Sequence, residues 1–243
     1  MRGLIYTAII LGAAAVASGC DGREGNGRDN EDAGAMVTKD FAVGDFKRIE
    51  SAGAFDVTVR TGSRASVRAE GPQKILDRLI VEVKGDQLSI RPRNGSFRWG
   101  RSGPVRIAVT VPELNEATLA GSGTLNVDKV VADRFKATIA GSGDISLPSI
   151  AAKSVEIEIA GSGSGSLAGQ TEQAAYVIAG SGELDASKLN SRDLKLTIAG
   201  SGSLNANASG SATGEILGSG DANISGGAKC TITKAGSGSI ICS

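Results

Sequence analysis

The chain has 243 residues, a length that fits one or two domains, and its 26 basic and 26 acidic residues balance at neutral pH. A balanced charge provides no global field that would select nucleic acid or an anionic membrane. Aromatic residues make up only 3% of the chain and histidine is absent, which excludes a core built on large rings, Ser-His-Asp and Cys-His arrangements, and histidine-based metal sites.

The first twenty residues have the features of a bacterial export signal. Arg2 supplies a short basic start, and the apolar segment 4–16 is too short to span a bilayer comfortably. It ends in VASGC, residues 16–20, which resembles the lipobox of bacterial lipoproteins, although Ala17 stands where Leu is commoner. We therefore expect residues 1–20 to be a lipoprotein signal peptide and Cys20 to be lipidated. An ordinary signal peptide, cleaved nearby, is the alternative.

Residues 21–38 are predicted to be a disordered tether. The stretch DGREGNGRDNEDAGA is polar, glycine-rich and nearly free of apolar residues. It would connect a lipid on Cys20 to a folded domain over residues 39–243. The protein is thus expected to be exported to the bacterial cell envelope and lipid-anchored, on the periplasmic side of the inner or outer membrane or at the cell surface.

The first part of this domain, residues 39–112, lacks a regular repeat. Strands are predicted at 53–60, 65–71 and 104–114, a short helix begun by a proline at 72–80, and a hairpin around Gly85 and Asp86 at 81–92. We expect these elements to form irregular first rungs that cap the stack of repeats that follows, because an uncapped stack exposes an open strand edge.

A basic segment, RPRNGSFRWGRSG, occupies residues 91–103 of this region. It contains no acidic residue and carries Arg91, Arg93, Arg98, Trp99 and Arg101. Such a loop is suited to hold an anionic glycan or a phosphate group. The alternative is a solvated loop whose tryptophan covers the end of the domain.

From residue 113 onward, a Gly-Ser-Gly triplet recurs at intervals of 18 to 20 residues. A flexible linker has no reason to keep such a period, whereas a stack of equivalent units does. Two residues before the first glycine lie Leu119, Ile139, Ile159, Ile178, Ile198 and Ile216. The alternation of apolar and polar residues continues on both sides of the triplet, so both flanks are predicted strands, with the glycines facing inward and the serine outward.

Strand, glycine bend and strand, closed by a polar turn, make one rung of about 18–20 residues. Stacked rungs predict an all-β parallel β-solenoid, or β-helix, with the regular rungs over residues 113–243. A sandwich of antiparallel hairpins is the alternative. It would require turn signals at a shorter spacing, and Asn-Gly and Asp-Gly turns are absent from the repeats.

Three motifs resemble the head GIN domain family. They are GAFDVTV at residues 53–59, VTVPELNEATLAGSG at 109–123, and the repeated IAGSG. The resemblance extends from about residue 40 to the end of the chain. It implies an exported bacterial β-solenoid protein of a kind often described as an adhesin, and it implies no catalytic residues.

Outward carboxylates are the catalytic candidates of this sequence, because some β-solenoids cleave polysaccharides. Asp144, Glu183 and Asp221 each lie three residues after the first glycine of a triplet, with hydroxyl residues in the rungs between them. At about 4.8 Å per rung, Asp144 and Glu183 would be roughly 9.6 Å apart, which is loose for acid–base work. We therefore expect a non-catalytic binding, adhesion or scaffolding module without cofactor or metal. An enzyme acting on cell-surface polysaccharide is the alternative.

The triplet serines form an outward column, beside a column that is almost entirely alanine. They are Ser122, Ser142, Ser162, Ser181, Ser201, Ser219 and Ser237. This flat, uncharged strip is predicted to pack against another copy of the protein, another envelope protein or a surface polymer. The alternative is that a tight bend simply tolerates small residues.

Two cysteines lie near the C-terminus. Cys230 is six residues before Gly236 and Cys242 six after it, so both are inward by parity. Export into an oxidising compartment favours a disulfide between them that pins the last rung. Two buried thiols are the alternative.

Overall fold

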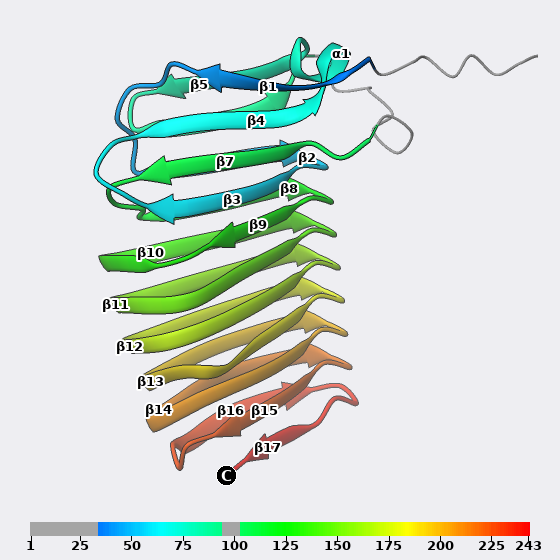
Figure 1. Ribbon diagram of the computed structural model, residues 1–243. Helices are drawn as coiled ribbons and strands as arrows, with labels where there is room; N and C mark the ends of the chain where they lie inside the picture. Colours follow the sequence, from blue (N-terminus) through cyan, green and yellow to red (C-terminus); the bar gives the residue numbers. More distant parts are fainter. Residues whose placement is uncertain (1–33, 94–102) are drawn as a thin grey trace, which may run out of the picture. The chain divides into compact units, whose positions relative to one another are not determined.

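The computed structural model describes residues 34–93 and 103–243, which form a 17-stranded sheet coiled into a parallel β-solenoid (Figure 1). The predicted fold class is confirmed. The signal peptide, Cys20 and most of the tether lie outside the described residues, as do Arg98, Trp99 and Arg101. Strand β1 begins at Met36, inside the predicted tether. Among the described residues, no helix has the length and apolar character needed to cross a bilayer.

The regular rungs are built from five long strands. They are β10 (Val130–Gly141), β11 (Asp144–Gly161), β12 (Ser164–Gly180), β13 (Glu183–Gly200) and β14 (Ser203–Gly218). All pair in parallel, and on both sides of the glycine triplet each residue stacks on its equivalent in the rung before, as Ile159 does on Ile139. The core is therefore a set of columns of Val, Ile, Leu and Ala, as the alternation predicted.

The corner opposite the glycine triplet differs from the expected turn. The strand continues through it, and the pairing shifts register there, for example between Leu147 and Ile150. Buried hydroxyls near this corner donate to backbone carbonyls: Thr171 donates to Lys153 O and Ser191 to Asn207 O. The polar residues of this segment thus form a bulged strand rather than a separate turn.

The two glycines of each triplet have different roles. The first is half-buried at the bend, where φ lies between +123° and +134°. The second is buried against the preceding rung, where a Cβ on Gly143 would lie 2.5 Å from Gly123 O and 2.7 Å from Leu119 Cδ2. The first glycine therefore permits the bend, and both glycines permit the close stacking of rungs.

The N-terminal part contains ten shorter elements. They are β1 (Met36–Phe41), β2 (Arg48–Gly53), β3 (Asp56–Thr61), β4 (Ser66–Pro72), α1 (Gln73–Leu76), β5 (Leu79–Lys84), β6 (Gln87–Pro92), β7 (Arg106–Val111), β8 (Glu116–Gly121) and β9 (Thr124–Val127). The hairpin around Gly85 is present as antiparallel β5 and β6. The helix predicted over residues 72–80 is shorter than expected, because α1 ends at Leu76 and the chain enters β5 at Leu79.

These elements do not stack in chain order. The rung β2–β3 lies between β6–β7 on one side and β8–β9 on the other, all in parallel. Beyond β6–β7, strands β5 and β4 run antiparallel, and β1 is antiparallel to β4. The antiparallel strands end the parallel stack. Ile75 and Leu76 of α1 are buried in the core at this end.

The C-terminal part is formed by β15 (Asp221–Ser225), β16 (Lys229–Ala235) and β17 (Ile240–Cys242). In this last rung the inward side chains of Cys230, Ile232 and Ile240 are only partly buried, whereas their equivalents in earlier rungs are covered on both sides.

Candidate binding surface

One outer face of the solenoid carries two columns of short polar side chains. It is made by β3, β9, the first parts of β11 to β14, β15 and β17, and we call it the polar face. The first column is Asp56, Thr124, Asp144, Ser164, Glu183, Ser203, Asp221 and Ser239. The second is Thr58, Asn126, Ser146, Ser166, Asp185, Asn205, Asn223 and Ile241.

A shallow trough of about 360 Å³ runs between the two columns over β9, β11, β12 and β13. Its sides are mainly hydroxyl, amide and carboxylate groups, and its floor includes Ile145 and Gly165. Gly165 stands where neighbouring rungs have Ile145 and Leu184, and a Cβ there would lie 2.7 Å from Leu184 Cδ1. The large Leu184 side chain therefore fills the core beneath a rung that has no side chain of its own at this position.

From β9 to β17 neither column contains a lysine or arginine, which makes this stretch of the polar face electronegative. At its N-terminal end, Arg106 of β7 lies beside Asp56 as the next outward residue of the first column. The carboxylates of Asp144 and Glu183 are exposed and make no hydrogen bond or ion pair with a described residue. Asp185 accepts from the hydroxyl of Ser187 at 2.6 Å and from its N–H at 3.1 Å, which lowers the pKa of Asp185. The carboxylates of Asp144 and Glu183 are therefore the acceptors left open to a ligand from solvent.

The predicted serine strip lies at the glycine corner, and all seven serines are exposed. Their N–H groups are not available to a ligand where they complete the stack, as Ser142 N–H does by donating to Gly121 O at 2.9 Å. The neighbouring column is alanine except for Leu217, which is 46% exposed. The strip thus offers hydroxyls and a narrow apolar margin.

Charged side chains gather at the corner of the rungs opposite the glycine triplets, which we call the ionic corner. This feature was not predicted from the sequence. Asp133, Lys153, Glu172 and Arg192 follow one another from rung to rung, so the sign alternates. Lys153 Nζ lies 2.7 Å from Asp133 Oδ1, and this pairing lowers the pKa of Asp133 and raises that of Lys153. Comparing charges one period apart in the repeat would have revealed this ladder.

The arginine segment is only partly described. Arg91 lies in β6, where its guanidinium donates to Glu82 Oε1 at 2.9 Å across the β5–β6 hairpin. Together with Lys84, which has the larger effect, it lowers the pKa of Glu82. Arg93 is exposed directly after β6. Arg91 is therefore already paired with the carboxylate of Glu82, which lies outside the basic segment 91–103.

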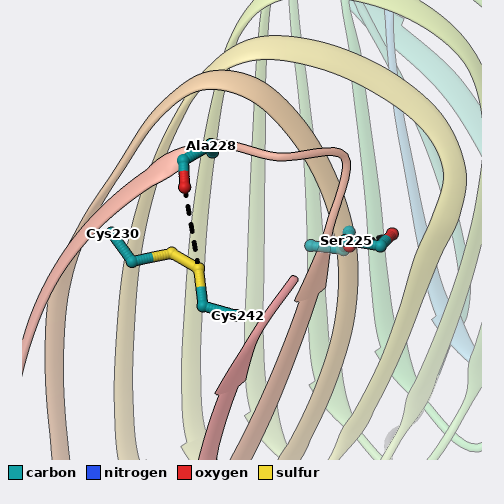
Figure 2. The surroundings of a disulfide bond; sticks show 5 residues. Ser225, Ala228, Cys230 and Cys242 are labelled. Carbon is teal, nitrogen blue, oxygen red and sulfur yellow. Dashed lines mark hydrogen bonds between the residues drawn. A yellow bond between two sulfur atoms is a disulfide. The ribbon is translucent and has the colours of Figure 1, made fainter.

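Cys230 and Cys242 are joined in a disulfide that links β16 to β17 (Figure 2). Their Cα atoms are 6.7 Å apart, and Cys242 Sγ faces Ala228 O at 3.9 Å. Cys230 is half-buried and Cys242 exposed. The bridge lies on the inward side, as parity predicted, but at an end where no described rung covers it.

No group of three or more metal-ligating side chains converges among the residues that the structure describes. The carboxylates of the polar face are likewise spread along the stack rather than gathered at one point. The arrangement is that of an extended surface, not of a closed pocket.

The repeated glycine corner and the capped solenoid agree with one sequence family. Residues 45–228 match the model of the family described as "Putative auto-transporter adhesin, head GIN domain". The chain belongs to this family. The resemblance drawn from the three motifs is thereby confirmed. None of the curated proteins compared with the chain matches it in sequence.

Solved structures share the fold of this head GIN domain protein. A putative adhesin from Bacteroides fragilis is 21% identical with a TM-score of 0.79, and the match covers 86% of this chain and 97% of that one. A putative lipid binding protein from Parabacteroides distasonis is 24% identical, with a TM-score of 0.71 and the same coverage. A putative adhesin from Parabacteroides merdae is 17% identical with a TM-score of 0.69, covering 87% and 98%.

Proposed function

We propose that the protein is a non-catalytic binding module of the bacterial cell envelope, which adheres through the side of its solenoid and is attached to a membrane by a lipid on Cys20. The polar face carries this proposal. It is an open surface that repeats along the stack and presents hydrogen-bonding groups without drawing them into one reactive centre. The family description and the names of two structural relatives, which are adhesins, support a role in binding.

The chemistry of the carboxylates favours binding over hydrolysis. Glycoside cleavage usually needs a carboxylic acid that stays protonated near neutral pH, which requires a raised pKa. Every carboxyl group whose pKa is clearly shifted in the described residues is shifted downward, by ion pairs or hydrogen bonds. Asp133, Asp185 and Asp221 are examples. Such groups remain ionised and act as acceptors.

The serine strip and the arginine segment are proposed as additional binding surfaces. The serine strip is proposed as a second contact surface, for another copy or another envelope protein. The arginine segment is proposed as a site for anionic glycan or phosphate, through Arg93 and the arginines outside the described residues.

The purified full-length protein should co-sediment saturably with isolated envelope polysaccharide. Two variants separate the surfaces: Asp144→Asn with Glu183→Gln on the polar face, and Ser142→Arg with Ser181→Arg and Ser219→Arg on the strip. We expect the first to weaken binding more than the second. Release of reducing sugar ends during the incubation, or absence of saturable binding, would overturn the proposal.

A further inference from the structure

The first column of the polar face alternates strictly between carboxylate and hydroxyl. From Asp56 to Ser239 the order is Asp, Thr, Asp, Ser, Glu, Ser, Asp, Ser. The structure adds Asp56, because β3 stacks on β9 and places Asp56 beside Thr124 although 68 residues separate them. The alternation therefore begins at β3, where the next residue of the column is Arg106 of β7, and continues from there into the regular rungs.

This alternation has a fixed length scale. Successive rungs lie about 4.8 Å apart, so the carboxylates recur about every 9.6 Å with one hydroxyl between them. Stacking of the rungs does not demand this period, since the adjoining column, from Thr58 to Ile241, shows none. Repulsion between like charges explains why neighbouring rungs are not both acidic, but not why no basic residue occupies either column from β9 to β17, since the same column accepts Arg106 beside Asp56 on β7.

On other surfaces of the same solenoid, carboxylates form ion pairs with lysines. On the opposite sheet face Lys136 Nζ lies 2.9 Å from Glu156 and 3.4 Å from Glu158. At the ionic corner Lys153 pairs with Asp133. On the polar face, Asp144 and Glu183 have no such partner among the described residues, and the trough lies between them and the second column. These carboxylates are left open beside a groove.

We propose that the polar face binds a linear polysaccharide of amino sugars, uncharged or cationic, whose chain lies along the solenoid axis in the trough. This assignment rests on the proposed binding function. Carboxylates and hydroxyls accept hydrogen bonds from sugar hydroxyls, amide N–H groups and ammonium groups. A polymer that presents such donors every two rungs meets equivalent acceptors at each repeat, and the negative charge disfavours anionic polymers.

The shape of the trough supports a chain rather than a small ligand. A pocket for a small molecule encloses most of its ligand, whereas this trough is shallow and open along the stack. No aromatic ring lines it, so no sugar stacks on a ring, and each sugar is held by hydrogen bonds, charge and contact with the aliphatic floor. Affinity must then come from many weak contacts along one chain and should rise steeply with chain length.

The test uses three probes on the full-length protein: chitosan oligosaccharides, neutral chitin oligosaccharides and polygalacturonate oligosaccharides, titrated by calorimetry. We expect the first two to bind, with longer oligomers binding more tightly, and the third not to bind. The pair Asp144→Asn and Glu183→Gln should weaken binding about tenfold or more. The control pair Glu172→Gln and Glu215→Gln changes the net charge equally on other surfaces and should leave affinity unchanged.

A second variant tests the period itself. Exchanging Asp144→Ser with Ser164→Asp keeps the net charge but moves one carboxylate by one rung, next to Glu183. Affinity should fall as much as on neutralisation. Unchanged binding by this variant, or equal binding of polygalacturonate, would overturn the assignment. Binding to whole envelope polysaccharide without binding to either chito-oligosaccharide would also overturn it, while leaving the proposed function standing.

Discussion

Glycine at the bend of each rung is required for two separate reasons. At Gly161, φ is +129°, a region that residues with a side chain rarely adopt, and a Cβ would collide with Gly141 O of the preceding rung. Rotation of a side chain cannot relieve this collision because its partner is backbone. The same conflict recurs at each triplet, so the glycine column is a property of the stack.

Gly161→Ala should therefore lower the free energy of unfolding by roughly 2–4 kcal/mol, combining strained φ with a backbone clash. The neighbouring Ser162→Ala is the matched control. Its side chain is exposed, and the change should stay within about 0.5 kcal/mol. Both values come from chemical denaturation followed by circular dichroism. A loss at Gly161 no larger than that of the control would show that the rungs can separate at the bend without cost.

At the scale of the rung, period-two alternation with a regular glycine triplet was enough to predict the strands, their parallel stacking and the inward cysteines. The insertion of β6–β7 beside β2–β3 was not predictable in this way. The corner of the β2–β3 rung is Gly53-Ala54-Phe55, and the buried Phe55 takes the place of the second glycine. This corner therefore lacks the Gly-Ser-Gly pattern that marks the other rungs in the sequence. Pairing between segments far apart in the sequence leaves no periodic pattern in either segment. The place of Asp56 beside Thr124 in the first column is unpredictable from the sequence for the same reason.

The last rung is held by hydrogen bonds that Asp221 accepts more strongly when it is ionised. The hydroxyl and N–H of Ser239 each donate to Asp221 Oδ1 at 2.7 Å, and these bonds lower the pKa of this carboxyl below its ordinary value of 3.8. A lowered folded-state pKa contributes stability above the unfolded value and loses it as the pH falls through the folded value.

Ser239→Ala should raise the pKa of Asp221 toward 3.8, because the hydroxyl is the larger cause of its depression. Carboxyl ¹³C NMR titration measures this directly. Ser203→Ala, in the same column but without a hydrogen bond to Asp221 among the described contacts, should leave that pKa where it is. An unchanged value in the Ser239 variant would show that the hydroxyl does not contact the carboxylate in solution.

The disulfide should stabilise the same rung against fraying. It joins residues 12 apart across the core end, and closing a loop of this size is worth about 3 kcal/mol. Replacing Cys230 and Cys242 together by Ser should lower stability by up to that amount and speed amide exchange in β16 and β17, with β11 and β12 unaffected. Mass spectrometry of the exported protein without reductant should find the native pair two protons lighter. Two free thiols there would contradict the bridge.

At the scale of the whole solenoid, the outward columns of side chains run along the stack, and this direction suits the surface to binding an extended partner. Each rung contacts mainly its neighbours, so every outward column runs along the stack, and a surface property repeated once per rung becomes a linear feature. The N-terminal end leaves this pattern with antiparallel strands and α1, and the C-terminal end is held by the disulfide. What remains for recognition is the side of the stack, where the polar face and the serine strip lie.

A side surface is useful for adhesion only if the stack is held at the membrane, and this depends on the proposed lipid at Cys20. Acyl chains supply the attachment, so Cys20→Ala should move the protein from the membrane fraction to the soluble fraction and remove the lipid mass from the mature chain. The folded domain is far from the substitution in sequence, so circular dichroism and polysaccharide binding should be unchanged. Asp21→Asn is the control, because it leaves the cysteine in place. Continued membrane fractionation of the Cys20 variant, with no change in mass, would mean that an ordinary signal peptide is cleaved and that another attachment holds the protein.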